Sequence, residues 1–147
     1  MELRPFVPQD EAAFLRMSHA MYDSPAVAHT VSEDVFRATF AACLAGGQNI
    51  EGWRLEENGV MAGYLLLAHT FSTELGGPIL MVEELYLEPP YRGHGIGRAV
   101  LETLRRKYTG QSVALKLECT PENEGAMHLY RSLGFEPLPY TAMVLPI

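Results

Sequence analysis

The sequence has no apolar run of membrane-spanning length, and it has fewer basic than acidic residues. Its 11 lysines and arginines stand against 18 aspartates and glutamates, for a formal net charge of −7 at pH 7. Because nucleic-acid binding depends on cationic side chains that neutralise phosphates, we expect no nucleic-acid partner. We also expect no membrane partner and a cytoplasmic location, since the first residues lack the apolar core of a signal peptide. The acidic balance favours a cationic amine as a ligand.

Cysteine and histidine are too scattered to predict a metal site. The two cysteines, Cys43 and Cys119, lie far apart in apolar surroundings, which is typical of buried free thiols. No C-x-x-C or H-E-x-x-H spacing is present, so we expect no metal. The histidines are His19, His29, His69, His94 and His128.

Length and composition indicate one globular domain that spans residues 1–147. Hydrophobic residues make up 48% of the chain and charged residues 20%, which is ordinary for a protein that buries a core. No internal repeat, linker or low-complexity stretch divides it.

Hydrophobic periodicity predicts an alternation of strands and helices. Asp10 is placed to cap a first helix, Thr30 and Glu33 form a possible capping box for a second, and Asn58-Gly59 indicates a tight hairpin. We expect strands at residues 3–7, 53–55, 60–68, 82–88, 113–119 and, to close the chain, at Phe135 and residues 140–145. Helices are expected to begin after Asp10, at Thr30, at the three glycines of residues 93–97 and after Glu122, and residues 70–78 are expected to form a connector. The predicted order is β-α-α-β-β-β-α-β-α-β-β.

Residues 82–97 combine a strand, a turn and the start of a helix. Pro89-Pro90 ends the strand, because proline lacks an N–H donor and disfavours the helical region for the residue before it. Three glycines at every second position then precede an amphipathic helix. The free N–H groups of a helix start attract anions, and glycine lets a ligand come close, so this stretch predicts a pyrophosphate site. Neither a Walker A loop nor a G-x-G-x-x-G fingerprint fits the letters.

The pattern that fits is Arg/Gln-x-x-Gly-x-Gly/Ala, present as Arg92-Gly93-His94-Gly95-Ile96-Gly97. A second pattern follows in Asn123, Ala126, Leu129-Tyr130 and Gly134-Phe135. In both motifs, and in their order, the chain resembles the GCN5-related N-acetyltransferases. The resemblance covers nearly the whole chain, and it implies an α/β (α+β, three-layer) fold with a mixed, mostly antiparallel central sheet flanked by helices.

The resemblance implies an N-acetyltransferase that moves acetyl directly from acetyl-CoA to a primary amine of a small molecule or a protein. The strand around Tyr86 is expected to splay from its neighbour and to offer unpaired backbone groups to the pantetheine and the thioester oxygen. The implied coenzyme contacts are Leu85, Tyr86, Leu87, Arg92, Gly93, His94, Gly95, Ile96, Gly97, Arg98, Asn123 and Tyr130. Asn123 is also placed to cap the last long helix.

Three residues are candidates for catalysis. Tyr130 matches the tyrosine that the family uses to protonate the thiolate of coenzyme A, and a phenol stays protonated at neutral pH. Glu83 and Glu84 precede the expected thioester position. Adjacent strand residues face opposite sides, so we expect at most one in the site. We favour Glu83 as base and Glu84 as an aid to orientation; the alternative is that both are solvated or bonded to Arg54.

Other roles stay open at the level of sequence. Tyr22, Asp23 and Glu74 are candidate substrate contacts, with a helix end or a solvated loop as the alternative. Cys119 as a covalent acetyl carrier is a weaker alternative to direct transfer. A non-catalytic acetyl-CoA sensor or regulatory module is the alternative function, and another acyl-CoA or a peptide N-terminus is an alternative substrate. The apolar residues 142–145 serve either a homodimer interface or the core.

Overall fold

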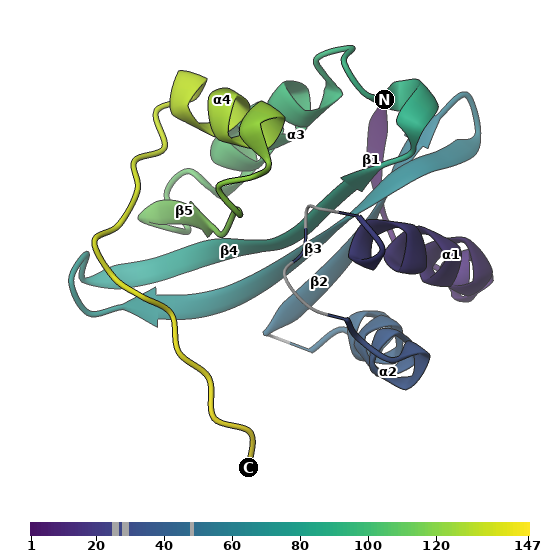
Figure 1. The fold of residues 1–147 in the computed structure, drawn as a ribbon, viewed down its shortest axis with the longest axis horizontal. Coiled ribbons are helices and arrows are strands. Elements are labelled where there is room, and N and C mark those ends of the chain that lie inside the picture. The colour runs from purple at the N-terminus through teal and green to yellow at the C-terminus, as the bar shows by residue number, and fades with distance from the viewer. Residues whose placement is uncertain (25–26, 28–29, 48) are drawn as a thin grey trace.

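The computed structural model describes the whole chain except residues 25–26, 28–29 and 48. A five-stranded sheet lies between two pairs of helices (Figure 1). The elements are β1 (Glu2–Pro5), η1 (Pro8–Asp10), α1 (Glu11–Tyr22), α2 (Glu33–Ala45), β2 (Ile50–Glu57), β3 (Val60–Ser72), β4 (Gly77–Leu87), η2 (Pro89–Tyr91), α3 (Ile96–Tyr108), β5 (Ala114–Leu117) and α4 (Glu124–Ser132).

The strands follow the chain in the order β1-β2-β3-β4-β5. All neighbours are antiparallel except β4 and β5, which are parallel and are joined through α3. Helices α1 and α2 cover one face, and α3 and α4 cover the other (Figure 1). The predicted mixed, mostly antiparallel sheet flanked by helices is therefore confirmed.

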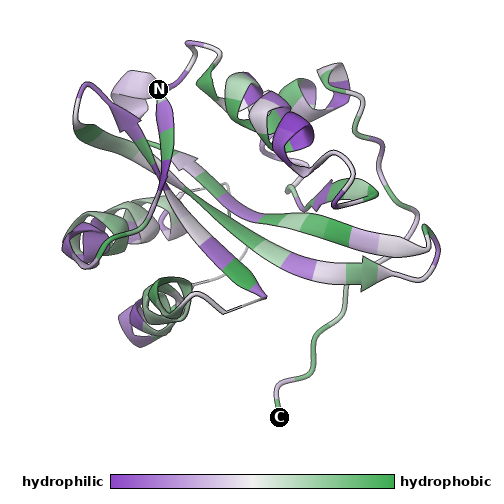
Figure 2. Cartoon of the chain, turned by 180° about the vertical axis from the view of Figure 1, so that it is seen from behind, coloured by the Kyte–Doolittle hydropathy of each residue, from purple (hydrophilic) through white to green (hydrophobic). Residues whose placement is uncertain are grey.

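The central strand β3 supplies both cores. Its residues alternate between the faces, with Tyr64 and Leu66 in the cluster under α1 and α2, and Leu65 and Leu67 in the cluster under α3. This double burial explains why the strand is apolar almost throughout. In Figure 2 the helices carry both hydrophobic and hydrophilic residues, whereas the tail after α4 is mostly hydrophobic.

Two hairpins join β2, β3 and β4. Asn58 and Gly59 both have positive φ, of 52° and 78°, as the predicted Asn-Gly hairpin requires. The connector predicted at residues 70–78 is shorter than expected. Strand pairing continues to Ser72 opposite Gly77, so only a tight turn separates β3 from β4.

The side-chain caps predicted for the first two helices are not formed. Asp10 stands at the start of α1 without capping it, because its carboxylate accepts hydrogen bonds from the Val7 amide (2.9 Å) and from Arg54 (3.2 Å). Helix α2 begins after Ser32, whose side chain makes no capping bond. The expected capping box between Thr30 and Glu33 is therefore wrong. The residues Tyr22-Asp23-Ser24-Pro25 predict the end of the first helix; α1 ends at Tyr22, and Pro25 lies outside the described residues.

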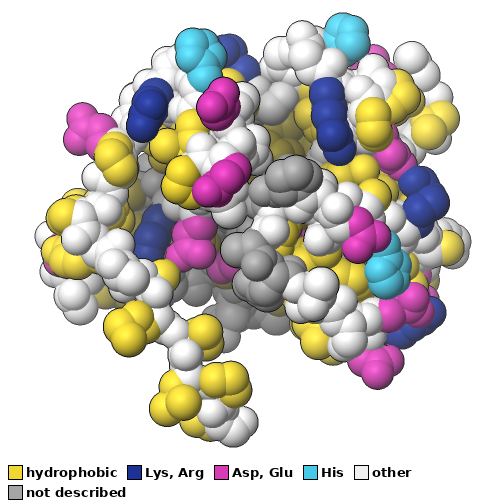
Figure 3. Space-filling view, in the orientation of Figure 1, with side chains coloured by type: hydrophobic (Ala, Val, Ile, Leu, Met, Phe, Trp, Pro, Cys, Tyr) yellow, Lys and Arg dark blue, Asp and Glu magenta, His cyan; other side chains and the backbone are white. Residues whose placement is uncertain are grey.

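The predicted closing strands are not formed. Residues 135–147 carry no helix or strand, and Met143 and Val144 are 93% and 91% exposed. The tail leaves the body after α4 and ends away from it (Figures 1 and 3). Pro137 and Pro139 offer a reason, because proline cannot donate to a strand ladder. The idea that residues 142–145 belong to the core is wrong for this chain.

Candidate active site

The strands β4 and β5 part halfway along β4. Their pairing runs from Ile79 opposite Ala114 to Val82 opposite Leu117, and no later pair joins them. Over residues 83–87, β4 stays paired with β3 only, so its other side offers backbone N–H and C=O groups without ladder partners in the described chain. The predicted splay of this strand from its neighbour is confirmed.

A β-bulge places both acidic neighbours at this opening. Leu66 pairs with Glu84 and Leu67 with Val82, so Glu83 is an extra residue in β4. Both glutamates line a cavity of about 70 Å³, which corrects the expectation that at most one would do so. A bulge interrupts the regular alternation of side chains along a strand. The cavity is lined by Met21, Val82, Glu83, Glu84, Leu85, Leu117, Glu118, Cys119, Asn123 and Tyr130.

The glycine loop is shaped for close approach of a ligand to the backbone. Gly93 and Gly95 have φ of 77° and 76°, a region that favours glycine, and no atom lies within 4 Å of where a Cβ would be at either. Gly95 precedes α3, whose first amides lack helical acceptors. His94 is exposed between the two glycines. The loop fits a pyrophosphate held by backbone N–H groups.

Two arginines flank this loop, and each already contacts the protein. Arg92 donates from Nε to the Leu87 carbonyl (2.8 Å) and lies over the Tyr86 ring. Arg98 donates to the Ser132 hydroxyl (2.5 Å) and so ties the start of α3 to α4. Both side chains are exposed and keep positive charge beside the loop.

Tyr130 on α4 and Met21 on α1 both line the cavity. Burial, and to a smaller degree Cys119, raises the pKa of its phenol, so it holds its proton at neutral pH. The Asn123 side chain accepts from the Ala126 amide at 3.3 Å, which confirms the predicted cap of α4. Burial also raises the pKa of the Cys119 thiol, and a protonated thiol is a poor nucleophile.

The two glutamates differ in their partners. Glu84 accepts hydrogen bonds from the Tyr22 hydroxyl (2.8 Å) and the Tyr64 hydroxyl (2.6 Å). The pKa of Glu83 is raised, first by burial and then by the charges of Glu118 and Glu84, with Lys116 opposing. The alternative bond to Arg54 is absent from the described chain, since Arg54 pairs with Asp10 and Glu56.

Sequence reasoning missed Tyr64 and Glu118. Tyr64 carries the only hydroxyl within the apolar stretch at residues 60–68, a signal that such a buried residue needs a polar partner. Glu118 follows β5 and reaches the cavity only because β5 stops beside the bulge. Tyr86 is 5% exposed, and its ring stacks on Tyr64.

The candidate substrate contacts are dispersed. Tyr22 reaches Glu84 from the end of α1, whereas Asp23 is exposed after that helix and is not among the cavity residues. Glu74 lies in the β3–β4 turn, where it accepts a hydrogen bond from Tyr140 (2.7 Å). Part of the segment between α1 and α2 falls outside the described residues.

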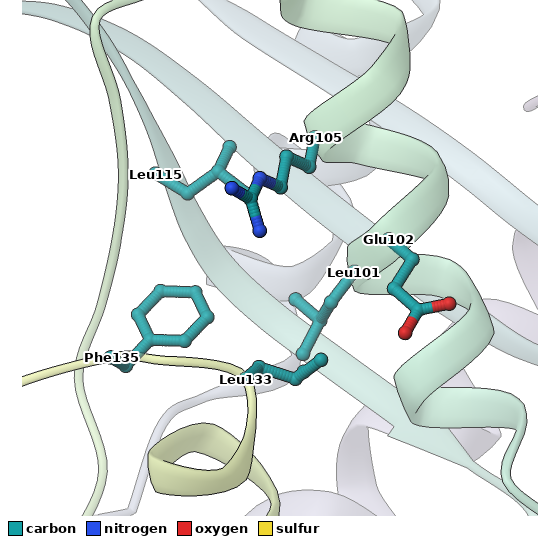
Figure 4. Close-up of a pocket in the computed structure, with 6 residues that line it drawn as sticks. All are labelled: Leu101, Glu102, Arg105, Leu115, Leu133 and Phe135. Carbon is teal, nitrogen blue, oxygen red and sulfur yellow. The ribbon is translucent and has the colours of Figure 1, made fainter.

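A second cavity, of about 30 Å³, lies between α3, β5 and the end of α4 (Figure 4). Leu101, Leu115, Leu133 and Phe135 border it with apolar side chains, while the carboxylate of Glu102 turns away from them. It is a packing gap beside the Gly-Phe of the second motif. Among the described residues, no group of His, Cys, Asp and Glu is arranged to hold a metal ion, and no helix has the length and apolarity to span a bilayer.

Comparison with protein families gives a match to the acetyltransferase (GNAT) family over residues 16–135. The chain belongs to this family. The matched span includes the bulged strand, the glycine loop and the helix that carries Tyr130. In this GNAT chain the second motif brings Asn123 and Tyr130 to the cavity, and the first stands at the start of α3, where Gly97 lies close to Leu129.

Among curated relatives, the chain is 33% identical over 79 residues to a thialysine N-epsilon-acetyltransferase from Bos taurus, covering 53% of this chain and 46% of that protein. It is 32% identical over 90 residues to the ribosomal protein bS18-alanine N-acetyltransferase of Escherichia coli K12, covering 60% and 57%. A mycothiol acetyltransferase from Nocardiopsis dassonvillei is 29% identical over 149 aligned positions, covering 92% and 42%. The chain thus spans about half the length of these relatives.

Solved structures share the fold at low identity. A possible acetyltransferase from Clostridium difficile 630 superposes with a TM-score of 0.82 at 16% identity, covering 99% of this chain and 97% of that one. AAC(6')-Iy, solved with a bisubstrate analogue of coenzyme A and acetylneamine, gives a TM-score of 0.78 at 15% identity, with coverage of 99% and 97%.

Proposed function

We propose that this GNAT domain is an N-acetyltransferase that uses acetyl-CoA and transfers acetyl directly to a primary amine of a small molecule or a protein. The observation that carries the proposal is the cavity where β4 and β5 part, which is lined by both Glu83 and Tyr130. The start of α3 lies close by, since a Cβ on Gly97 would come within 3.2 Å of Leu129, the neighbour of Tyr130. Donor site and proton-transfer groups therefore share one opening.

Acetyl-CoA supplies the acetyl group as a thioester. The backbone N–H groups from Gly93 to Gly97, with Arg92 and Arg98 beside them, hold its diphosphate, and Asn123 and the open side of β4 at Leu85, Tyr86 and Leu87 hold the pantetheine. Glu83 takes the proton from the acceptor amine, whose nitrogen forms the new C–N bond. As the C–S bond breaks, Tyr130 donates its proton to the thiolate sulfur.

The acceptor is a cationic amine, which the three carboxylates at the cavity support. The names of the relatives include both protein and small-molecule acceptors, so both classes belong in the first assay. The proposed acceptor contacts are Tyr22, Asp23 and Glu74. Of these, Tyr22 is connected to the cavity by its hydrogen bond to Glu84.

The proposal is tested by measuring thiol release from acetyl-CoA, with polyamines, aminoglycosides, amino acids and short peptides as acceptors. We expect turnover on one class, and a loss of kcat of about 100-fold in Tyr130→Phe, because general-acid catalysis is removed while the ring remains. Coenzyme binding, measured by calorimetry, should persist in that variant. Tight coenzyme binding without turnover on any acceptor would instead favour a sensor module, and absent coenzyme binding contradicts the proposal.

The pH dependence of kcat/KM tests the role of Glu83. A base must be unprotonated, and the pKa of Glu83 is raised, so activity should fall as the pH drops through a value above the ordinary 4.5. Glu83→Gln should lower kcat/KM by about 100-fold and remove this acidic limb. If the pH profile of kcat/KM keeps its acidic limb in Glu83→Gln, that limb belongs to another group, such as the acceptor amine.

The exposed apolar tail supports a further part of the proposal, that two copies pair through it. Met143, Val144 and Leu145 are 83% to 93% exposed, and large exposed apolar segments are typical of interfaces. Sedimentation should give a dimer for the full chain and a monomer for a chain that ends at Tyr140. A full-length monomer at high concentration contradicts this part alone.

A further inference from the structure

Glu83 and Glu84 line the same cavity, but their carboxylates have different surroundings. Glu83 makes no hydrogen bond or ion pair with the part of the chain that the structure describes. Glu84 accepts two hydrogen bonds from phenols, one on each oxygen. The pair therefore consists of one free and one fixed carboxylate, side by side.

The two donors to Glu84 come from different elements. The Tyr22 hydroxyl, at the end of α1, lies 2.8 Å from Oε1, and the Tyr64 hydroxyl, in β3, lies 2.6 Å from Oε2. The terminal torsion of a glutamate is broad when it is free. Donors on both oxygens restrict that rotation and set the plane of the group.

Both tyrosines are themselves held in place. Tyr64 is fully buried, with its ring edge-on to Phe14 at 4.9 Å between centroids, and Tyr22 packs on Phe36 at 5.1 Å. Burial first, and then the charge of Glu84, raises the pKa of both phenols. They therefore remain protonated donors over the working range of pH.

A fixed carboxylate suits recognition of a cation better than proton transfer. A carboxylate has about four acceptor positions, and the phenols use two of them. An ammonium that binds the others finds the group already oriented, so little conformational freedom is lost on binding. The described lining of the cavity includes no lysine or arginine that competes for this role.

We propose that Glu84 is the anchor for a positively charged group of the acceptor, and that Tyr22 and Tyr64 are positioning residues that act through it. This inference rests on the proposed function and divides the work of the two glutamates, with Glu83 for the proton and Glu84 for the charge. It also assigns a role to α1, whose Met21 lines the cavity and whose Tyr22 hydroxyl holds Glu84.

Binding without turnover tests the proposal. The probe is 1,4-diaminobutane, titrated by calorimetry into protein saturated with coenzyme A, which carries no acetyl group. We expect Glu84→Gln to weaken probe binding by about tenfold, as for loss of a charge-assisted hydrogen bond, and Tyr22→Phe to weaken it by about threefold. Tyr22→Phe combined with Glu84→Gln should bind no more weakly than Glu84→Gln alone. In turnover the acceptor KM of Tyr22→Phe should rise while kcat stays within about twofold.

The matched control is Tyr108→Phe, which removes a phenol-to-carboxylate hydrogen bond of 2.7 Å, to Glu51, away from the cavity. It should leave probe binding unchanged. The proposal is overturned if Tyr22→Phe leaves probe binding unchanged. It is also overturned if Tyr22→Phe weakens probe binding as much in the Glu84→Gln background as in wild type. If wild type binds coenzyme A but not the probe, the proposal is overturned while the proposed function stands, whereas failure to bind coenzyme A removes both.

Discussion

The helices on the two faces of the sheet are packed differently where they border the candidate site. Under α1 and α2, the rings of Phe6, Phe14, Phe40 and Tyr64 contact one another at centroid distances of 4.9 to 5.5 Å. On the other face, α4 has no fully buried residue, although it carries Tyr130. The wall that fixes Glu84 is thus densely packed, and the wall that holds the proposed acid is lightly packed.

The largest effect should come from the dense wall. Phe14→Ala removes a ring that is 1% exposed and leaves a cavity among three other aromatic rings. We expect the free energy of unfolding to fall by about 3–5 kcal/mol, as measured by denaturant titration. If the free energy of unfolding falls by less than about 1 kcal/mol, the aromatic cluster relaxes into the space left by the ring. The packing under α1 and α2 would then differ less from that of α4 than the structure indicates.

The matched change on the lightly packed wall is Leu129→Ala in α4. Leu129 is half-buried at the edge of the second cluster, beside Gly97. Its truncation should cost only about 1 kcal/mol of unfolding free energy, because less apolar surface is removed from contact. The coenzyme affinity should fall as well, since Leu129 contacts the start of α3. If Phe14→Ala and Leu129→Ala lower the free energy of unfolding equally, the two walls of the site do not differ in packing.

Features with a local chemical cause were predictable from sequence. Asn58-Gly59 takes positive φ because these residues tolerate it, and Gly93 and Gly95 do so at the start of α3. The cap by Asn123 follows from a side chain that can accept from a helix amide. The glycines of this loop and Asn123 also belong to the two motifs on which the family resemblance rests.

The proposed acceptor site depends on contacts between distant segments, which hydrophobic periodicity does not encode. The bulge at Glu83 has no glycine or proline to mark it, yet it turns two neighbours into one site. Tyr64 and Tyr22 meet at Glu84 from two elements. Likewise, the apolar residues at 140–145 favour burial, but the sequence does not identify what would cover them. Pro137 and Pro139, just before this segment, disfavour a strand.

A smaller effect concerns the far end of α3, where Glu51 joins α3 to β2 and β3. Burial alone would raise the pKa of Glu51, but hydrogen bonds from Tyr108, His69 and Trp53 together lower it below 4.5. Its contribution to stability is therefore present above the unfolded pKa and is lost as the pH falls through the lowered folded value.

Glu51→Gln checks that contribution. Because the group is partly exposed, we expect a loss below about 1 kcal/mol at pH 7, shrinking toward zero in acid, as measured by urea unfolding at a series of pH values. The variant should leave acetyl-CoA binding intact, since Glu51 is remote from the glycine loop in the sheet order. A difference between wild type and variant that stays constant down to low pH would show that packing, rather than charge, carries the effect.

The smallest effect should come from removing residues 141–147. These residues are exposed throughout, so at low protein concentration their loss should change the free energy of unfolding by less than about 0.5 kcal/mol. Denaturant titration at two concentrations checks this, because stabilisation by a second copy grows with concentration and should vanish in the truncated chain. A large loss that does not depend on concentration would mean that the tail packs on its own chain.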